Sequence, residues 1–449
     1  MLVWVVAILS FGLAASILPG FYIDTGVPGW HVAVLRLLLI FAVLLIVLRP
    51  LLLFLTLPLN SLTLGLPTLL FNGLILFLTA RGEPAIVIEN FGDAWIGTLI
   101  VTVISTGVVG WLGLDEAYPF YQSLIYRLGR RFGPRARMRP ARGLLILQID
   151  GLSHGSLRTV LDRGRMPTIT AMLAKGSHRL FRWNCGIPSN TPAVQAGFLY
   201  GNRDNVAGYR WFDRREQRLR VVNQPADLRE LEAMVASDGD PLLTDGSCIN
   251  SFLSGGAAKR LLTVSALGIP DEDRRAGEKA DFNLFFLSPN AYTKAVLNGL
   301  WDYLSGLALA AIGWFRPSRT RLRFSFKRVA QQAVANAFLR DLSFFWLKQD
   351  MIRGVPIIYS NFVGYDDVAH YSAPDAYEAQ VALAAFDRRL RRLRRRAQQD
   401  PVLPYDMVLL SDHGQTPSVP FRVLYRQTIE EVLAGMVGRL QVRGSDPSR

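Results

Sequence analysis

The sequence contains few of the residues that build disulfide frameworks and thiolate metal sites. Its 449 residues include only two cysteines, Cys185 and Cys248, and five histidines. The two cysteines stand far apart and isolated, so they indicate neither a disulfide scaffold nor a cysteine metal site. Internal repeats and low-complexity tracts are also absent, which leaves a chain with room for two or three ordinary domains.

Lysine is rare as well, since only six of the 50 basic residues are lysine and the others are arginine. The formal net charge of +14 favours anionic partners, namely acidic lipid head groups, phosphorylated substrates or nucleic acid. Nucleic acid is the weakest of these candidates, because no helix-turn-helix, zinc-finger or RNA-binding signature is present.

Charged residues are nearly missing from the first 115 positions. Four apolar stretches, at about 2–18, 33–57, 62–79 and 94–113, are long enough to span a hydrocarbon core of roughly 30 Å. The first is not typical of a signal peptide, because it lacks a basic start and a small-residue cleavage site, and three further spans follow. We therefore expect a four-helix transmembrane region over residues 1–125.

Basic residues are concentrated after the last of these stretches. The loop 19–32 has no lysine or arginine, whereas the segment 127–142 holds seven arginines. Because cytoplasmic loops are enriched in basic residues, both ends of the chain are expected in the cytoplasm, on a multi-pass protein of the cell membrane. Residues 126–142 then form an Arg-rich linker that anionic lipid attracts. A miscount of one span would place the second domain outside.

The segment LTLPLNSLTLGLPTLLFNGLILFLTA, 55–80, carries a specific run of the form LPLN-x-LTLG. On this run, residues 30–113 resemble the four-span family named after phage holins, holin family 4. The resemblance implies a membrane region, and the family name does not by itself establish that such proteins make lesions.

From residue 143 the pattern changes to short apolar runs that alternate with helical segments, which predicts a parallel α/β sheet. Three runs end just before an aspartate: 144–149 before Asp150, 355–363 before Asp366, and 405–410 before Asp412. In parallel sheets the ligand crevice lies beyond the carboxyl ends of the strands. One such aspartate is commonly a helix cap or a turn, but three gathered at one edge would repel unless cations neutralise them.

Two of these aspartates have a histidine beside them. Asp366 stands four residues before His370, a spacing that places both side chains on one helical face. Asp412 and His413 are adjacent and can both reach a metal from the turn after their strand, where Gly414 permits an unusual backbone. Carboxylate and imidazole ligands without thiolates suit Zn²⁺, with Mn²⁺ as a substitute.

A nucleophile is expected in CGIPSNTPAVQAGFLYG, 185–201. Thr191 at the N-cap with Pro192 at the first helical position predicts a helix start. This can be a capped helix and nothing more. A hydroxyl at a helix N-terminus also lies among N–H groups that bind phosphate oxygens, which suits a nucleophile in phosphoryl transfer.

Four motifs together resemble the type I phosphodiesterase/nucleotide pyrophosphatase branch of the alkaline phosphatase superfamily, over residues 143–415. They are IDG at 149–151, MPTITAMLAKG at 166–176 followed by Thr191-Pro192 and Gly201, D-x-x-x-H at 366–370, and SDHG at 411–414.

The resemblance implies an enzyme that hydrolyses a phosphodiester or pyrophosphate bond with two divalent metal ions. Thr191 would be the transiently phosphorylated nucleophile. One metal ion would be held by Asp150, Thr191, Asp412 and His413, and the other by Asp366 and His370. The substrate would be a phosphorylated small molecule, a nucleotide or a lipid-linked compound.

The chain departs from this family in one respect: no histidine follows His413, where the family takes a further ligand for the second metal. We expect either a truncated catalytic domain over 143–449 or a second metal held by two residues and water. The competing hypothesis is a holin-like membrane protein whose second domain is degenerate and non-catalytic.

An insertion is expected at about 202–350, and it carries no ligand motif. Its apolar segment 296–315 is interpreted as a buried or membrane-surface helix, because a membrane crossing there would divide the composite site. GYRWF, 208–212, either lines the substrate pocket or forms a core strand.

Overall fold

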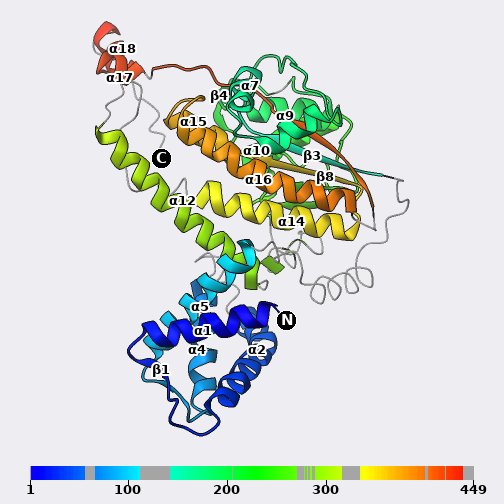
Figure 1. Cartoon of the computed structure of the whole chain (residues 1–449). Coiled ribbons are helices and arrows are strands. Elements are labelled where there is room, and N and C mark those ends of the chain that lie inside the picture. Colours follow the sequence, from blue (N-terminus) through cyan, green and yellow to red (C-terminus); the bar gives the residue numbers. More distant parts are fainter. Residues whose placement is uncertain are drawn as a thin grey trace. The chain divides into compact units, whose positions relative to one another are not determined.

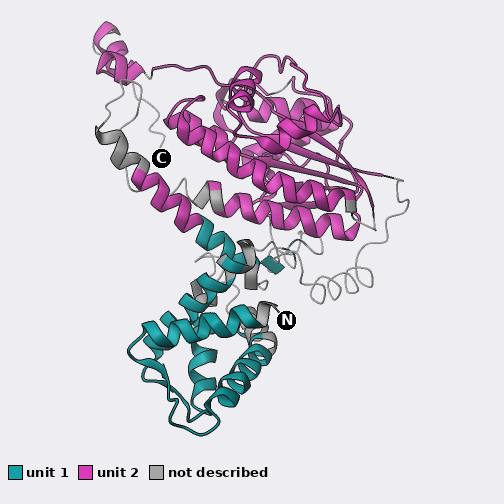
Figure 2. Cartoon of the chain, in the orientation of Figure 1, with its two compact units in different colours: residues 1–134, 276–298 teal, residues 135–275, 299–449 magenta. Residues whose placement is uncertain are grey.

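A computed structural model describes residues 2–55, 66–111, 142–204, 206–269, 278, 281, 284–285, 289–315, 334–399, 403–419 and 421–437. The chain divides into two compact units, residues 1–134 with 276–298 and residues 135–275 with 299–449 (Figure 2). The LPLN-x-LTLG run and the Arg-rich linker, apart from Arg142, lie outside the described residues. The domain boundaries expected from the sequence remain predictions.

The first unit contains a helix at each of the four apolar stretches (Figure 1). These are α1 (Leu2–Ile17), α2 (Trp30–Leu55), α4 (Leu66–Ala80) and α5 (Phe91–Trp111). Two short antiparallel strands, β1 (Phe21–Ile23) and β2 (Ile86–Ile88), pair between them. The core gathers Phe11, Phe21, Leu37 and Leu76, all fully buried. No helix in the part of the chain that the structure describes combines the length and the apolarity needed to cross a membrane.

The second unit contains the parallel sheet that the sequence predicts. Its strands are β3 (Gly143–Ile149), β6 (Ser247–Ile249), β7 (Lys259–Leu261), β8 (Ile357–Phe362) and β9 (Tyr405–Leu410), in the order β7-β6-β8-β3-β9. The register pairs Ile149 with Phe362 and Gln148 with Leu410. The carboxyl ends of the neighbouring strands β8, β3 and β9 are therefore level, so the residues that follow them meet at one edge.

Helices cover the sheet of the second unit. They are α7 (His154–Asp162), α8 (Pro167–Ala174), α9 (Thr191–Tyr200), α10 (Pro225–Ser237), α14 (Arg340–Arg353), α15 (Gly364–Tyr371) and α16 (Tyr377–Gln399). α9 and α10 bury one face, where Leu199 and Leu228 pack in a cluster with Tyr359 of β8. α14 and α16 lie side by side (Figure 1), and their Phe344 and Phe386 pack against the ring of Phe362. Tyr359 and Phe362 project to opposite faces, so the helices form two layers around the sheet.

The remaining elements lie largely in the region expected to be an insertion. They are the hairpin β4 (Arg210–Asp213) and β5 (Arg218–Val221), α12 (Pro289–Phe315), and, beyond β9, the helices α17 (Phe421–Tyr425) and α18 (Ile429–Val437). The segment 296–315 is helical within α12, as predicted. Its residues up to 298 group with the first unit and those from 299 with the second.

A buried polar network fixes α9 to the sheet. Gln195 donates from Nε2 to the Tyr359 hydroxyl over 3.0 Å and accepts at Oε1 from the backbone N–H of Phe252 over 3.0 Å. The Tyr359 hydroxyl in turn donates to Oε1 of Gln148 in β3. Since Gln195 lies one helical turn beyond Thr191, this network holds the start of α9 at a fixed height above the strand ends.

Candidate metal and nucleophile site

Three of the predicted ligands form a tight cluster at the carboxyl edge of the sheet. Asp150 follows β3 and Asp412 follows β9, and both are buried. Asp150, Asp412 and His413 each offer one ligand atom, and these atoms lie within 4.8 Å of one another. Nε2 of His413 is 3.5 Å from Oδ1 of Asp150 and 3.6 Å from Oδ2 of Asp412. Strand ends far apart in the sequence thus converge where the pattern predicts.

The cluster is electrostatically suited to a cation. Burial raises the pKa of Asp150 well above its ordinary value, and the charges of Asp412 and Asp366 raise it further. Burial also raises the pKa of Asp412. Oδ2 of Asp412 is buried and has no hydrogen-bond partner among the described residues. An orphaned carboxylate oxygen beside a second carboxylate and an imidazole is a donor set that fits a divalent metal ion.

Thr191 also lies in this cluster, although the predicted capping position is wrong by one residue. The N-cap of α9 is Asn190, whose side-chain oxygen accepts from the N–H of Ala193 over 3.1 Å, and Thr191 is the first helical residue. Because Asn190 caps the helix, the hydroxyl of Thr191 remains free for the site. It donates to Oδ1 of Asp150 over 3.1 Å and lies 3.2 Å from Nε2 of His413.

The pair Asp366 and His370 occupies one face of α15, as its spacing predicts, with Nε2 of His370 3.1 Å from Oδ2 of Asp366. Burial raises the pKa of Asp366, but hydrogen bonds from His370 and Gln415 outweigh it and leave that pKa below its ordinary value. The hydrogen bond to Asp366 raises the pKa of His370. Neither residue belongs to the three-residue cluster.

Gly151 brings this pair against the cluster. It follows Asp150 directly, adopts φ +70°, and leaves so little room that a Cβ there would overlap the carboxylate of Asp366. The two predicted metal-binding groups are therefore neighbours across a glycine backbone, and only glycine combines this conformation with this approach.

Gly414 has a different role from the predicted one. Its φ does not fall among the positive values found in the described chain, so no unusual backbone explains it. A Cβ at Gly414 would instead lie 2.7 Å from Cβ of Ser153. The turn after β9 needs a small residue because the loop after β3 packs directly against it.

Two further side chains at the site were not predicted as functional from the sequence. Asn361, the penultimate residue of β8, donates from Nδ2 to Oδ2 of Asp150 over 2.8 Å. Gln415 donates from Nε2 to the Asp366 carboxylate and to its backbone oxygen. Only their places in the sequence could have indicated a role, because each is a polar residue within a few positions of an expected ligand.

Tyr209 comes from the GYRWF segment, for which pocket lining and a core strand are the two interpretations. Burial, followed by the negative charges of Asp150 and Asp366, raises the pKa of its phenol to about 12. The ring packs edge-on against Phe252, yet the residue remains 46% exposed. The segment leads into the two-stranded hairpin β4–β5, so it is not a strand of the main sheet, and the pocket-lining interpretation remains a prediction.

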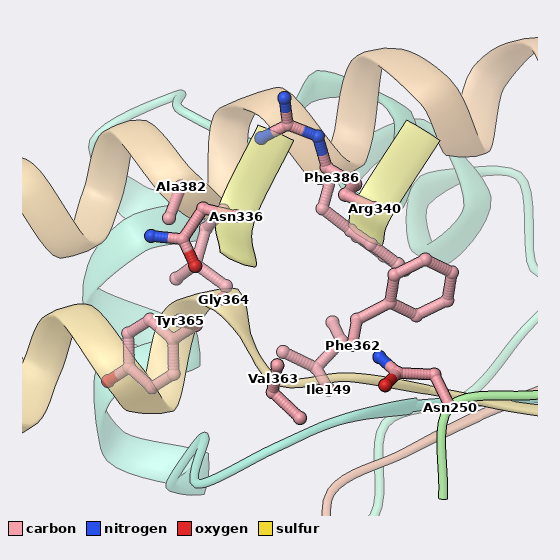
Figure 3. Close-up of a pocket in the computed structure, with 11 residues that line it drawn as sticks. Ile149, Asn250, Asn336, Arg340, Phe362, Val363, Gly364, Tyr365, Ala382 and Phe386 are labelled. Carbon is pink, nitrogen blue, oxygen red and sulfur yellow. The ribbon is translucent and has the colours of Figure 1, made fainter. Parts of the chain in front are cut away.

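A separate small cavity of about 30 Å³ lies behind the site, between the sheet and the helices α14 and α16. Figure 3 shows Asn336 and Arg340 across it from Ile149 and Asn250. Oδ1 of Asn336 and Nε of Arg340 are buried without a hydrogen-bond partner among the described residues. The volume and these two polar atoms suit one bridging water. We therefore interpret the cavity as a hydrated part of the packing behind the site.

Two family models match the chain. Residues 1–106 match the mycobacterial 4 TMS phage holin, superfamily IV, and residues 144–444 match the type I phosphodiesterase / nucleotide pyrophosphatase family. A search of curated proteins finds no match. The second match covers more than half of the chain and agrees with the five-stranded parallel sheet, which is typical of the alkaline phosphatase fold. The chain therefore belongs to the type I phosphodiesterase / nucleotide pyrophosphatase family.

Proposed function

We propose that the second unit is a metal-dependent phosphoesterase that hydrolyses a phosphodiester or pyrophosphate bond, with Thr191 as its nucleophile. The observation that carries this proposal is the position of the Thr191 hydroxyl, within hydrogen-bond distance of Asp150 and His413. The candidate nucleophile contacts a cluster of potential metal ligands. In a chain of this family, that contact favours phosphoryl transfer over a purely binding role.

We propose that the site holds two divalent ions. Asp150, Thr191, Asp412 and His413 would hold one ion, and Asp366 with His370 would contribute to the second. Oxygen and imidazole donors favour Zn²⁺, with Mn²⁺ as a substitute. When bound, such ions neutralise the crowded carboxylates and stabilise the charge on the phosphoryl oxygens.

The protein's own residues position the reaction. Oγ1 of Thr191 attacks phosphorus and forms a new O–P bond as its O–H bond breaks and gives the proton to solvent. The bond to the leaving oxygen breaks, and that oxygen takes up a proton from solvent. The positive end of the α9 dipole favours the phosphoryl group on Thr191. Water then attacks phosphorus and releases Thr191, which completes hydrolysis.

We also propose that residues 1–125 attach the protein to the cell membrane as a multi-pass region. The match of residues 1–106 to a four-span family and the four apolar helices support this attachment. The arginines of 127–142 favour a cytoplasmic position for the catalytic unit. The same match keeps a second candidate in view, a holin-like protein whose second unit binds without catalysis.

Hydrolysis of bis(p-nitrophenyl) phosphate by the purified full chain tests the enzyme. We expect zinc-dependent turnover that a chelator abolishes. Thr191→Val removes the hydroxyl at nearly constant volume and should reduce kcat by at least about 10³-fold, whereas Thr191→Ser keeps a hydroxyl and should retain part of the activity. A folded, zinc-loaded protein without turnover would favour the non-catalytic candidate.

A further inference from the structure

The loop between α8 and α9 exposes large apolar side chains. Within residues 179–187, Phe181 is 74% exposed, Trp183 is 52% exposed and Ile187 is 90% exposed. Single exposed apolar residues are ordinary on protein surfaces, but three in nine positions make a patch of the kind that marks a binding surface. Burying them would recover free energy in proportion to the area removed from water.

Positive charge surrounds this patch. Arg179 and Arg182 are exposed within the loop, and exposed Lys175 precedes it, while residues 175–187 contain no aspartate or glutamate. The guanidinium of Arg394 lies 3.4 Å from Oγ of Ser177, which brings the arginine-rich helix α16 to the start of the loop. Apolar side chains flanked by arginines are complementary to a surface with an apolar interior and an anionic outer layer.

Two hydrogen bonds hold the loop in place from Trp183 onward. Nε1 of Trp183 donates to the backbone oxygen of Ser411 over 3.0 Å, next to the candidate ligand Asp412. Two positions later, Arg203 donates to the backbone oxygen of Cys185 and fills the space beside Gly186, whose φ is +74°. The indole N–H is thus satisfied while its ring stays exposed, and the patch is held in a set position beside the cluster.

We propose that residues 179–187 form a docking loop that inserts Phe181, Trp183 and Ile187 into the interface of a bilayer rich in anionic lipid. Aromatic rings settle at the head-group level, and nearby arginines bind head-group phosphates. A bilayer is favoured over a protein partner because residues 1–106 of the same chain match a four-span family, which supplies a tethered membrane at high effective concentration.

Docking would hold the Asp150, Asp412 and His413 cluster at the level of the lipid head groups. If the proposed phosphoesterase activity holds, the preferred substrate class is then a phosphodiester or pyrophosphate carried by a lipid. The docking itself does not depend on catalysis, so the two can be tested apart.

Quenching by brominated lipids tests the docking on the full chain in lipid nanodiscs. A fluorophore is attached through Phe181→Cys in a background with Cys185→Ser and Cys248→Ser, and the matched control carries it through Leu242→Cys, an exposed apolar position elsewhere in the second unit. We expect lipids brominated on the acyl chains to quench the label at 181 at least about twofold more than the label at 242. Nanodiscs with anionic phosphatidylglycerol should give stronger quenching than phosphatidylcholine alone.

Charge reversal separates docking from catalysis. Arg179→Glu with Arg182→Glu should abolish the dependence on anionic lipid, while zinc-dependent hydrolysis of soluble bis(p-nitrophenyl) phosphate stays unchanged. Equal quenching at 181 and 242, or a label at 181 that is shielded from water yet not quenched by brominated lipid, would overturn the proposal, the latter because protein covers the loop. An inactive enzyme whose label is still quenched would refute the proposed function and leave the docking intact.

Discussion

The hydroxyl of Thr191 donates a hydrogen bond to Oδ1 of Asp150 across 3.1 Å, although the two residues are 41 positions apart in the sequence. Asp150 ends a central strand, and Thr191 begins a helix that Gln195 ties to that strand and its neighbour. The contact therefore depends on the whole layer arrangement of the second unit. It places the one hydroxyl expected to attack phosphorus against the group expected to bind a metal.

Asp412 is predicted to be required for metal binding. Asp412→Asn keeps the shape of a fully buried side chain but removes its charge, so the bound zinc should fall by about one ion per chain with little change in the fold. Elemental analysis of the dialysed protein measures the zinc content. The exposed Asp375→Asn is the matched control. Zinc content that stays the same in Asp412→Asn would remove this residue from the ligand set.

Asn361 is predicted to orient Asp150, since its Nδ2 lies 2.8 Å from Oδ2 of that carboxylate. Partners that hold a ligand in place commonly contribute 10–100-fold in metal affinity, so Asn361→Leu should weaken zinc binding by roughly that factor. Isothermal titration with zinc gives the affinity. Asn223→Leu, at an exposed asparagine outside the site, is the matched control. An unchanged affinity would mean that Asp150 needs no support from β8.

Alanine variants of two glycines should separate the cost of a strained backbone from damage to the site. Gly151→Ala and Gly164→Ala both place a side chain at positive φ, which costs about 1–2 kcal/mol in the free energy of unfolding. Only the first would also push into the carboxylate of Asp366, because nothing lies within 4 Å of a Cβ at Gly164. Urea unfolding should show similar or larger losses for Gly151→Ala, and the phosphodiesterase assay should show loss of activity for it alone. Equal activities would contradict the close approach.

The raised pKa of Asp150 predicts how the stability of metal-free protein depends on pH. A carboxyl with a raised folded-state pKa contributes stability that is complete below its ordinary value of 3.8 and is lost as pH rises through the folded pKa. Asp150→Asn mimics the protonated form. The Tm of the metal-free wild type should therefore fall relative to this variant as pH rises above about 4, and saturating zinc should restore it. A constant difference in Tm would argue against a charge conflict at Asp150.

The central part of the site follows from the sequence because strand ends are local signals. Asp150 and Asp412 stand directly after apolar runs, and parallel pairing brings such ends to one edge, so their meeting needs no knowledge of side-chain contacts. The i, i+4 spacing of Asp366 and His370 likewise fixes a shared helical face before any packing is known.

The remaining features depend on contacts that the sequence does not encode locally. The N-cap prediction is wrong because Asn190 and Thr191 are both residue types that cap helices well. In the structure Asn190 is the cap, and the Thr191 hydroxyl contacts Asp150 and His413 instead. Gly414 was explained by conformation, whereas its cause is the approach of Ser153 from a loop about 260 positions earlier. Asn361 is recognisable as a site residue only from the pairing of β8 with β3, which brings its side chain to Asp150.

The covalent step is the central claim, and mass spectrometry of the quenched reaction tests it most directly. Full-length protein is mixed with excess bis(p-nitrophenyl) phosphate and zinc, quenched in acid within the first turnover and digested with trypsin. We expect a nitrophenyl phosphate adduct on Thr191, in the peptide that begins at Trp183, and no adduct in Thr191→Val. Substrate hydrolysis by an enzyme whose Thr191 never carries phosphorus would contradict it.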